Sequence, residues 1–137
     1  MTPNKAIETV DRLKPNSYSE EDKLRWINDL EGNVKRLVFQ WDEKYLEELK
    51  SRLESGKLTQ EQYNELVEQT KPYTYPNDMD KELLIPAPFE NLYELYLSAQ
   101  IDYHNKEYEY YNNSVTMFET QYSEYKKDYI RHNQARG

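Results

Sequence analysis

The side chains that could carry out chemistry are few in this sequence, and their spacing does not suit a catalytic or metal site. The chain has no cysteine and two histidines, His104 and His132. Neither histidine has a second strong ligand at the spacing that zinc or di-iron sites use. The three glycines, Gly32, Gly56 and Gly137, do not form a phosphate-binding loop. The sequence therefore predicts no catalytic residue, no cofactor and no metal site, and we expect that the protein is not an enzyme.

Carboxylates occur in adjacent groups along the chain, as in residues 20–22, 42–43 and 47–48. Acid–base catalysis by two carboxylates requires a cleft in which their pKa values are pushed apart. Acidic groups that lie between apolar stripes are instead typical of the solvated face of a helix. We assign these groups to the surface, and an enzyme or enzyme subunit remains an alternative that a bound metal or a deep polar pocket would support.

Tyrosine is unusually frequent, with 14 residues in a chain of 137. Tyr108, Tyr110 and Tyr111 fall within five residues, so on a helix their rings point to several faces and cannot all enter one core. One interpretation is that the rings are buried and only their hydroxyls reach water. The other is an interface, where tyrosine is enriched because it offers a large contact area. We predict that at least one of the three contacts a partner.

The overall composition is that of a small acidic protein with a thin core. Of the residues, 36% are hydrophobic and 32% are charged, and the net charge is −8. This charge argues against broad affinity for a nucleic-acid backbone. A core poor in apolar residues favours an oligomer, because a partner subunit can cover the remaining apolar surface. The N-terminal residues lack the apolar region of a signal peptide. The sequence also contains no run of about 20 apolar residues, the length that is needed to span a membrane, so we expect a cytoplasmic protein.

Two helices are predicted in the first 41 residues. Thr2 is a suitable N-cap with Pro3 at the first helical position, and Pro15 ends this helix. Ser19 caps the second helix, whose apolar positions continue to Trp41, and whether the helix runs past Trp41 is left open. The first stripe consists of Ala6, Ile7, Val10 and Leu13, and the second of Leu24, Ile27, Leu30, Val34, Leu37, Val38 and Trp41.

A helical hairpin is predicted over residues 42–69. Gly56 suits the left-handed position after the first of its helices, and Thr59 with Gln62 forms a capping box for the second. The apolar faces consist of Leu46, Leu49 and Leu53 in the first helix and of Tyr63, Leu66 and Val67 in the second.

Residues 71–88 are predicted to form an extended arm. Pro72, Pro76, Pro86 and Pro88 exclude a continuous helix, and there is room for one strand-like stretch. A segment of this length without regular structure is uncommon inside a compact domain and is usually functional. We expect the arm to pack on something else.

Helical periodicity returns at Phe89, with a break expected near residues 104–106. The sequence leaves open whether residues 89–131 form one helix or two. The stripe before the break consists of Leu92, Leu95, Tyr96, Ala99 and Tyr103, and the stripe after it of Val115, Phe118, Tyr122, Tyr125 and Tyr129. The second stripe has the spacing of a helix that packs along another helix. Residues 130–137 are expected to be a basic, flexible tail.

These elements predict a mainly all-α fold, a small bundle of four to five helices with a proline-rich extended arm. Residues 1–137 form a single domain in this interpretation, with residues 42–69 as a hairpin insertion. The predicted core consists of Ile7, Val10, Leu24, Ile27, Leu30, Leu92, Tyr96, Ala99, Phe118 and Tyr122.

Two blocks of the sequence, residues 5–32 and 83–125, resemble a known family. The marker residues are Lys14-Pro15-Asn16, Trp26, Leu30, Pro86, Pro88, Tyr93, Tyr96-Leu97, Ala99-Gln100-Ile101-Asp102 and Tyr111-Asn112-Asn113. In these blocks the chain is similar to the head–tail connector, or head-completion adaptor, proteins of tailed phages and prophages of Gram-positive bacteria. The hairpin of residues 42–69 departs from the family pattern, and its role is in doubt.

The resemblance implies a structural virion protein at the phage head–tail junction. Its subunits would form a homo-oligomeric ring, expected to be twelve-fold, between the portal protein and a tail-side adaptor or stopper protein. DNA would pass through the ring without specific binding, and no membrane would be involved. The protein would reside in the host cytoplasm before assembly.

The residues predicted to contact other subunits, the portal or the tail come from the arm, the tyrosine cluster and the basic end. They are Tyr73, Tyr75, Leu83, Leu84, Ile85, Tyr108, Tyr110, Tyr111, Lys126, Lys127, Arg131 and Arg136. The alternative is a small acidic phage-encoded regulatory protein that binds a host protein through its helical surface.

Overall fold

The computed structural model describes residues 1–38 and 43–134, and the regular structure in these ranges is entirely helical. Its helices are α1 (Pro3–Leu13), α2 (Glu20–Val38), α3 (Glu43–Glu54), α4 (Gln60–Thr70), α5 (Leu92–His104) and α6 (Tyr108–Gln134). The predicted all-α class is confirmed. Six helices lie in these ranges instead of the expected four to five, because the segment after Phe89 is divided into α5 and α6. Trp41 lies outside the described residues.

The predicted helix starts are confirmed by their hydrogen bonds. The Thr2 hydroxyl accepts a hydrogen bond from the Lys5 N–H at 3.2 Å, and Pro3 is the first residue of α1. The Ser19 hydroxyl accepts one from the Asp22 N–H at 3.1 Å, at the start of α2. These bonds satisfy N–H groups that have no partner within the helix.

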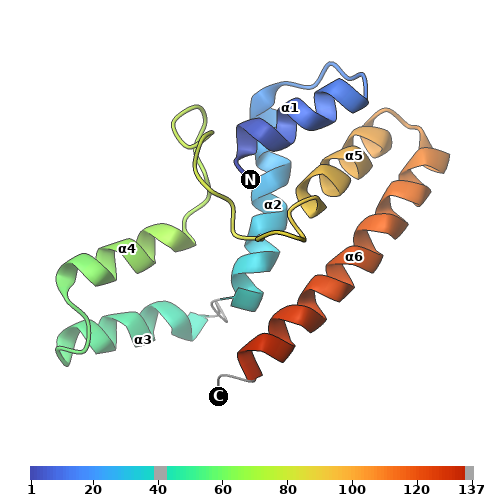
Figure 1. The fold of residues 1–137 in the computed structure, drawn as a ribbon. Coiled ribbons are helices and arrows are strands. Elements are labelled where there is room, and N and C mark those ends of the chain that lie inside the picture. The colour runs from blue at the N-terminus through green and yellow to red at the C-terminus, as the bar shows by residue number, and fades with distance from the viewer. Residues whose placement is uncertain (39–42, 135–137) are drawn as a thin grey trace.

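Helices α1, α2, α5 and α6 form the body of the molecule, in which α5 and α6 lie side by side (Figure 1). Seven of the ten predicted core residues are buried: Ile7, Val10, Leu24, Ile27, Leu30, Leu92 and Ala99. Tyr96, Phe118 and Tyr122 are half-buried and pack against this core, with their rings in contact. Helix α6 therefore covers the core with the predicted aromatic stripe, of which Tyr125 is the buried member.

The expected break after α5 is a tight turn that reverses the chain into α6. Lys106 has a φ of 61°, in the left-handed region. The turn is closed by hydrogen bonds from Asn105 N to Ile101 O at 2.9 Å and from Glu107 N to Asp102 O at 2.9 Å. Residues 89–131 thus contain two helices, and the second extends to Gln134. Residues 130–134 of the expected tail are helical, and Arg136 lies outside the described residues.

The predicted hairpin is present as α3 and α4, which pack against each other and stand apart from the body (Figure 1). Gly56 has a φ of 78°, and the Thr59–Gln62 capping box is formed in both directions. Among residues 44–54 of α3, Leu49 is the buried side chain, while α4 has no buried residue. Since the core cluster contains no residue of α3 or α4, the body does not depend on the hairpin for its interior.

We therefore expect that a short Gly/Ser linker can replace residues 43–70 without unfolding the body. Val38 and Lys71 line the same pocket, so residues 39–42 followed by a linker of about six residues can join them. Loss of a surface excursion of this kind should change the free energy of unfolding by less than about 1 kcal/mol, measured by urea denaturation. The control is Leu92→Ala, which removes a core side chain and should cost about 2–5 kcal/mol. A deletion as damaging as Leu92→Ala would contradict this account of the fold.

Candidate interaction surfaces

A buried carboxylate attaches the proline-rich arm to the body. The Glu31 side chain, from α2, is fully buried and accepts hydrogen bonds from the Tyr93 hydroxyl, from the Tyr73 hydroxyl at 3.1 Å and from the Leu84 N–H at 3.2 Å. The Tyr93 hydroxyl in turn accepts a hydrogen bond from the Ile85 N–H at 2.9 Å. This cluster, which we call the Glu31 anchor, joins α2, α5 and both ends of the arm. Burial raises the pKa of the Glu31 carboxyl above its usual value, with the hydrogen bonds acting in the opposite direction.

Further polar contacts hold the start of the arm against α2. The Asn28 side chain donates to the Tyr73 carbonyl and accepts from the Tyr73 N–H, both at 2.9 Å. The Lys35 ammonium donates to the Lys71 carbonyl at 2.7 Å. Within the arm, the Asp78 carboxylate accepts hydrogen bonds from the backbone N–H and the hydroxyl of Thr74 and pairs with the Lys81 ammonium, and together these contacts lower the pKa of Asp78 to about 2. The arm is therefore an ordered part of the body that turns back on itself.

The structure corrects the interface assignment for part of the arm. Leu83 and Ile85 are buried in the chain's own core, where they pack with Met79. Tyr73 and Leu84 are half-buried. The apolar run collapses onto its own subunit because the Glu31 anchor satisfies the N–H groups of residues 84 and 85, which would otherwise be costly to bury. Tyr75 is the arm ring that stays exposed, at 43%.

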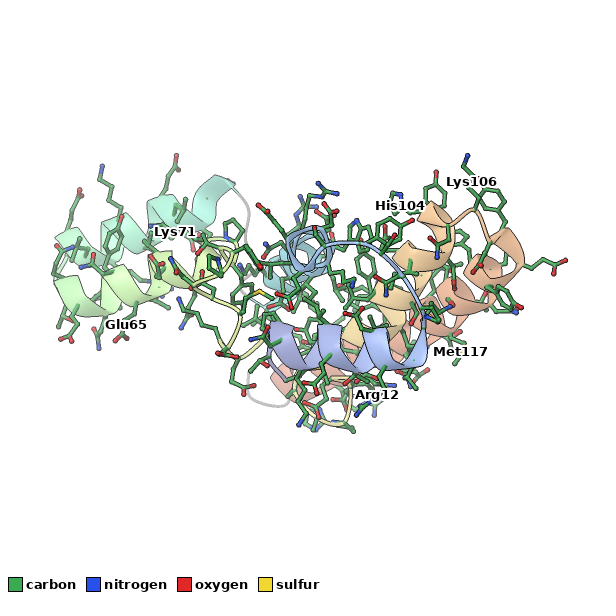
Figure 2. The ribbon with its side chains drawn as sticks, turned by 90° about the horizontal axis from the view of Figure 1, so that it is seen from above. Arg12, Glu65, Lys71, His104, Lys106 and Met117 are labelled. Carbon is green, nitrogen blue, oxygen red and sulfur yellow. The ribbon has the colours of Figure 1, made fainter. Side chains whose placement is uncertain are left out.

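The most exposed aromatic side chains gather at the turn between α5 and α6. Tyr103, Tyr108 and Tyr110 are 51%, 55% and 62% exposed, and Leu13 at the end of α1 is 72% exposed. We call these four residues the aromatic tip. The ring centroid of Tyr103 lies 6.3 Å from that of Tyr108, and the Lys14 ammonium lies 5.9 Å from that of Tyr110. His104 and Lys106, which mark this turn, lie at the end of the molecule opposite Glu65 of the hairpin (Figure 2).

Buried interactions fix the backbone under the aromatic tip. The Asp102 carboxylate, fully buried, pairs with the Lys14 ammonium at 2.5 Å and accepts a hydrogen bond from the Ser114 hydroxyl at 2.9 Å. These two contacts tie the end of α1 and the start of α6 to α5. The Trp26 and His104 rings stack with centroids 5.1 Å apart, and Trp26 is almost fully buried. The tip therefore presents exposed rings on a support that is already ordered.

Sequence reasoning found part of the aromatic tip. Tyr108 and Tyr110 were predicted to be contact residues and are exposed, whereas Tyr111 is half-buried against Tyr103. Tyr103 and Leu13 were assigned to apolar stripes and are exposed instead. Both lie in the last turn of their helices, beyond the residues that contact the core cluster. The sequence predicts a chain break after each of them, and this break is the signal that could have identified the two residues as exposed.

The predicted basic contact residues lie on one half of α6. Lys126, Lys127 and Arg131 are exposed, and Ile130 between them is 45% exposed. The Lys126 ammonium lies over the ring of Tyr122, 5.1 Å from its centroid. The structure thus brings these cations together on one surface, at a distance along α6 from the aromatic tip.

A pocket of about 600 Å³ lies where the end of α4 meets the arm. Its charged lining is already paired in part: Lys71 with Glu68 at 3.2 Å, and Lys81 with Asp78 at 3.0 Å. Among residues 1–38 and 43–134, no three His, Asp or Glu side chains are grouped in a way that could hold a metal ion. In the same residues, no helix combines the length and the apolar character needed to cross a membrane.

The Glu31 anchor predicts a large effect for the loss of one hydroxyl. Tyr93→Phe leaves the Oε1 atom of the buried Glu31 carboxylate and the Ile85 N–H each without its hydrogen-bond partner, so the free energy of unfolding should fall by about 2–3 kcal/mol. Urea denaturation measures this change. The matched control is Tyr108→Phe, which removes a hydroxyl from an exposed ring and should stay within about 0.5 kcal/mol of wild type. Equal effects for the two variants would contradict the anchor.

The raised pKa of Glu31 predicts a pH dependence with a definite sign. Because the folded state binds the Glu31 proton more tightly than the unfolded state, the stability that protonation provides is present below the unfolded value of 4.5 and is lost as the pH rises through the folded value. The free energy of unfolding of wild type should therefore fall relative to that of Glu31→Gln as the pH rises from about 4 towards 8. A difference between the two proteins that does not change with pH would contradict the raised pKa.

No protein-family model, no curated protein and no solved structure matches this chain.

Proposed function

We propose that the protein is a structural subunit of the head–tail junction of a tailed phage, a non-enzymatic adaptor that assembles into a ring between the portal and the tail. The observation that carries this proposal is the aromatic tip. Three exposed tyrosines at an ordered turn, together with the exposed Leu13 at the end of α1, offer a large contact area without a cost for ordering the backbone. A surface of this kind is suited to docking on another protein, in this proposal the portal or the tail-side component.

The remaining features support an assembly role. A subunit that lies between two other components needs two separate contact surfaces, and the chain carries the aromatic tip and the hairpin at opposite ends (Figure 2). Its net charge of −8 suits a channel through which DNA slides, since it avoids the affinity that basic surfaces have for the phosphate backbone. The sequence resemblance to head–tail connector proteins supplies the identity of the assembly.

The proposal predicts that the protein is part of mature phage particles and that the aromatic tip is needed for its incorporation. The triple variant Tyr103→Ser, Tyr108→Ser and Tyr110→Ser should reduce the amount in purified particles at least about tenfold, as expected for the loss of several interface anchors. Its free energy of unfolding should change by less than about 1 kcal/mol, because the three rings are largely exposed. Quantitative mass spectrometry of the particles measures incorporation.

The control is Tyr75→Ser, which removes an exposed ring from the arm. It should be incorporated like wild type. Absence of the wild-type protein from mature particles would overturn the proposed function and favour a regulatory protein that binds a host factor. Normal incorporation of the triple variant would remove the aromatic tip from the proposal.

A further inference from the structure

A small pocket lies between the start of α5 and the middle of α6. Helices α5 and α6 lie side by side, and the chain reverses between them (Figure 1), which brings these two stretches together. The pocket has a volume of about 290 Å³, a size that suits one long side chain. None of its lining residues is charged: they are Asn91, Leu95, Thr116, Met117, Thr120 and Gln121.

Two buried oxygens of this pocket's side chains lack a hydrogen-bond donor. The Asn91 Oδ1 and Gln121 Oε1 atoms are shielded from solvent, and neither has a hydrogen-bond partner among the described residues. Asn91 directly precedes α5, yet its side chain does not cap the helix. Within residues 1–38 and 43–134, no other buried side-chain nitrogen or oxygen is without a partner. Because a buried acceptor without a donor is costly, the meeting of both at one pocket points to a group that binds there.

The group that satisfies these two acceptors must donate at least two hydrogen bonds. The last torsion of an Asn or Gln side chain is soft, so a small rotation presents each oxygen to the pocket that its side chain lines. The Thr116 hydroxyl does not compete, since it donates to the Asn112 carbonyl at 2.7 Å. The Leu95 and Met117 side chains supply an apolar wall, and Met117 is 57% exposed.

The charge around the pocket favours a cation. Residues 87–105 and 107–125, which include α5 and the part of α6 that forms the pocket, contain no lysine or arginine. Glu94 follows Asn91 by three residues, and Glu119 follows Thr116 by three, so both lie one helical turn from the lining. Neither carboxylate forms an ion pair with any residue that the structure describes, although the Arg12 charge acts on Glu94.

We propose that this pocket binds the arginine side chain of a partner protein. A guanidinium is a planar cation with five N–H donors and no acceptor, and it is carried on an apolar stem. It donates to the side-chain oxygens of Asn91 and Gln121, while its stem packs on Leu95 and Met117. No residue of the pocket belongs to the aromatic tip, so this site goes beyond the proposed function and does not rest on it.

NMR titration of the isotope-labelled protein with N-acetyl-arginine amide tests the site. The side-chain NH2 signals of Asn91 and Gln121 should shift and saturate, with a dissociation constant on the order of 1 mM, because a single side chain makes few contacts. N-acetyl-citrulline amide keeps the shape of arginine and loses its charge. It should bind at least about fivefold more weakly, since hydrogen bonds from a charged donor are stronger.

Two variants of Gln121 separate binding from stability. Gln121→Met keeps the length of the side chain and removes the oxygen, so it should weaken arginine binding at least about fivefold. It should not lower the midpoint of urea denaturation, because an acceptor without a donor is lost. Gln121→Glu places a carboxylate at the pocket and should tighten arginine binding at least about fivefold. The matched control is Gln100→Met, at a half-buried glutamine of α5 outside the pocket, and it should bind like wild type.

Each of the other outcomes would overturn the site. The absence of a saturable shift, or a shift that Gln121→Met leaves unchanged, would mean that water alone occupies the pocket or that arginine binds elsewhere. Equal binding of the citrulline probe would show that the pocket does not select a cation. A lower denaturation midpoint for Gln121→Met than for Gln100→Met would mean that the Gln121 amide is paired within the chain. These measurements use the isolated protein, so they are independent of whether it is found in phage particles.

Discussion

The stability of this small fold depends on the hydrogen bonds that one buried carboxylate receives. Glu31 lies inside the body, and its oxygens are satisfied by two tyrosine hydroxyls and a backbone N–H. A buried carboxylate without such partners is very costly, so α2, α5 and the arm are stable only together. The chain can form a stable core despite its low apolar content, because the arm adds Met79, Leu83 and Ile85 to a core that the helices alone leave incomplete.

The local features of the fold could be predicted from the sequence, whereas the burial of residues that depends on long-range contacts could not. The caps at Thr2, Ser19 and Thr59 depend on neighbouring residues, which is why they could be predicted from spacing. Glu31 offered no local signal, since an acidic residue beside Leu30 in an amphipathic pattern is typical of a solvated face. Its burial depends on donors that arrive more than 40 residues later in the chain. The same return of the chain buries Leu83 and Ile85, which a local pattern could equally assign to a partner.

The candidate surfaces were also predictable only where the signal is local in the sequence. The crowding of tyrosines at residues 107–111 pointed to contact residues, and two of the three rings are exposed. Tyr103 joined them because the helix ends beside it, a fact of tertiary position. The surfaces that remain open to partners all lie outside the Glu31 anchor, on the turn, on the hairpin and on α6. The molecule thus separates a centre held by directional polar contacts from a periphery that carries exposed apolar and charged groups.

The tight turn at Lys106 also sets the rotational phase of the longest helix. Each residue of an α-helix advances the side chains by about 100°, and α6 begins within two residues of this turn. Asp102 ties the first turns of α6 to α5 through Ser114. One inserted residue after Lys106 would rotate Tyr125 out of the core and carry Lys127 and Arg131 to another side of the molecule. Natural variation in length is therefore expected in the α3–α4 loop, and the spacing from Asp102 to Tyr125 should be held constant.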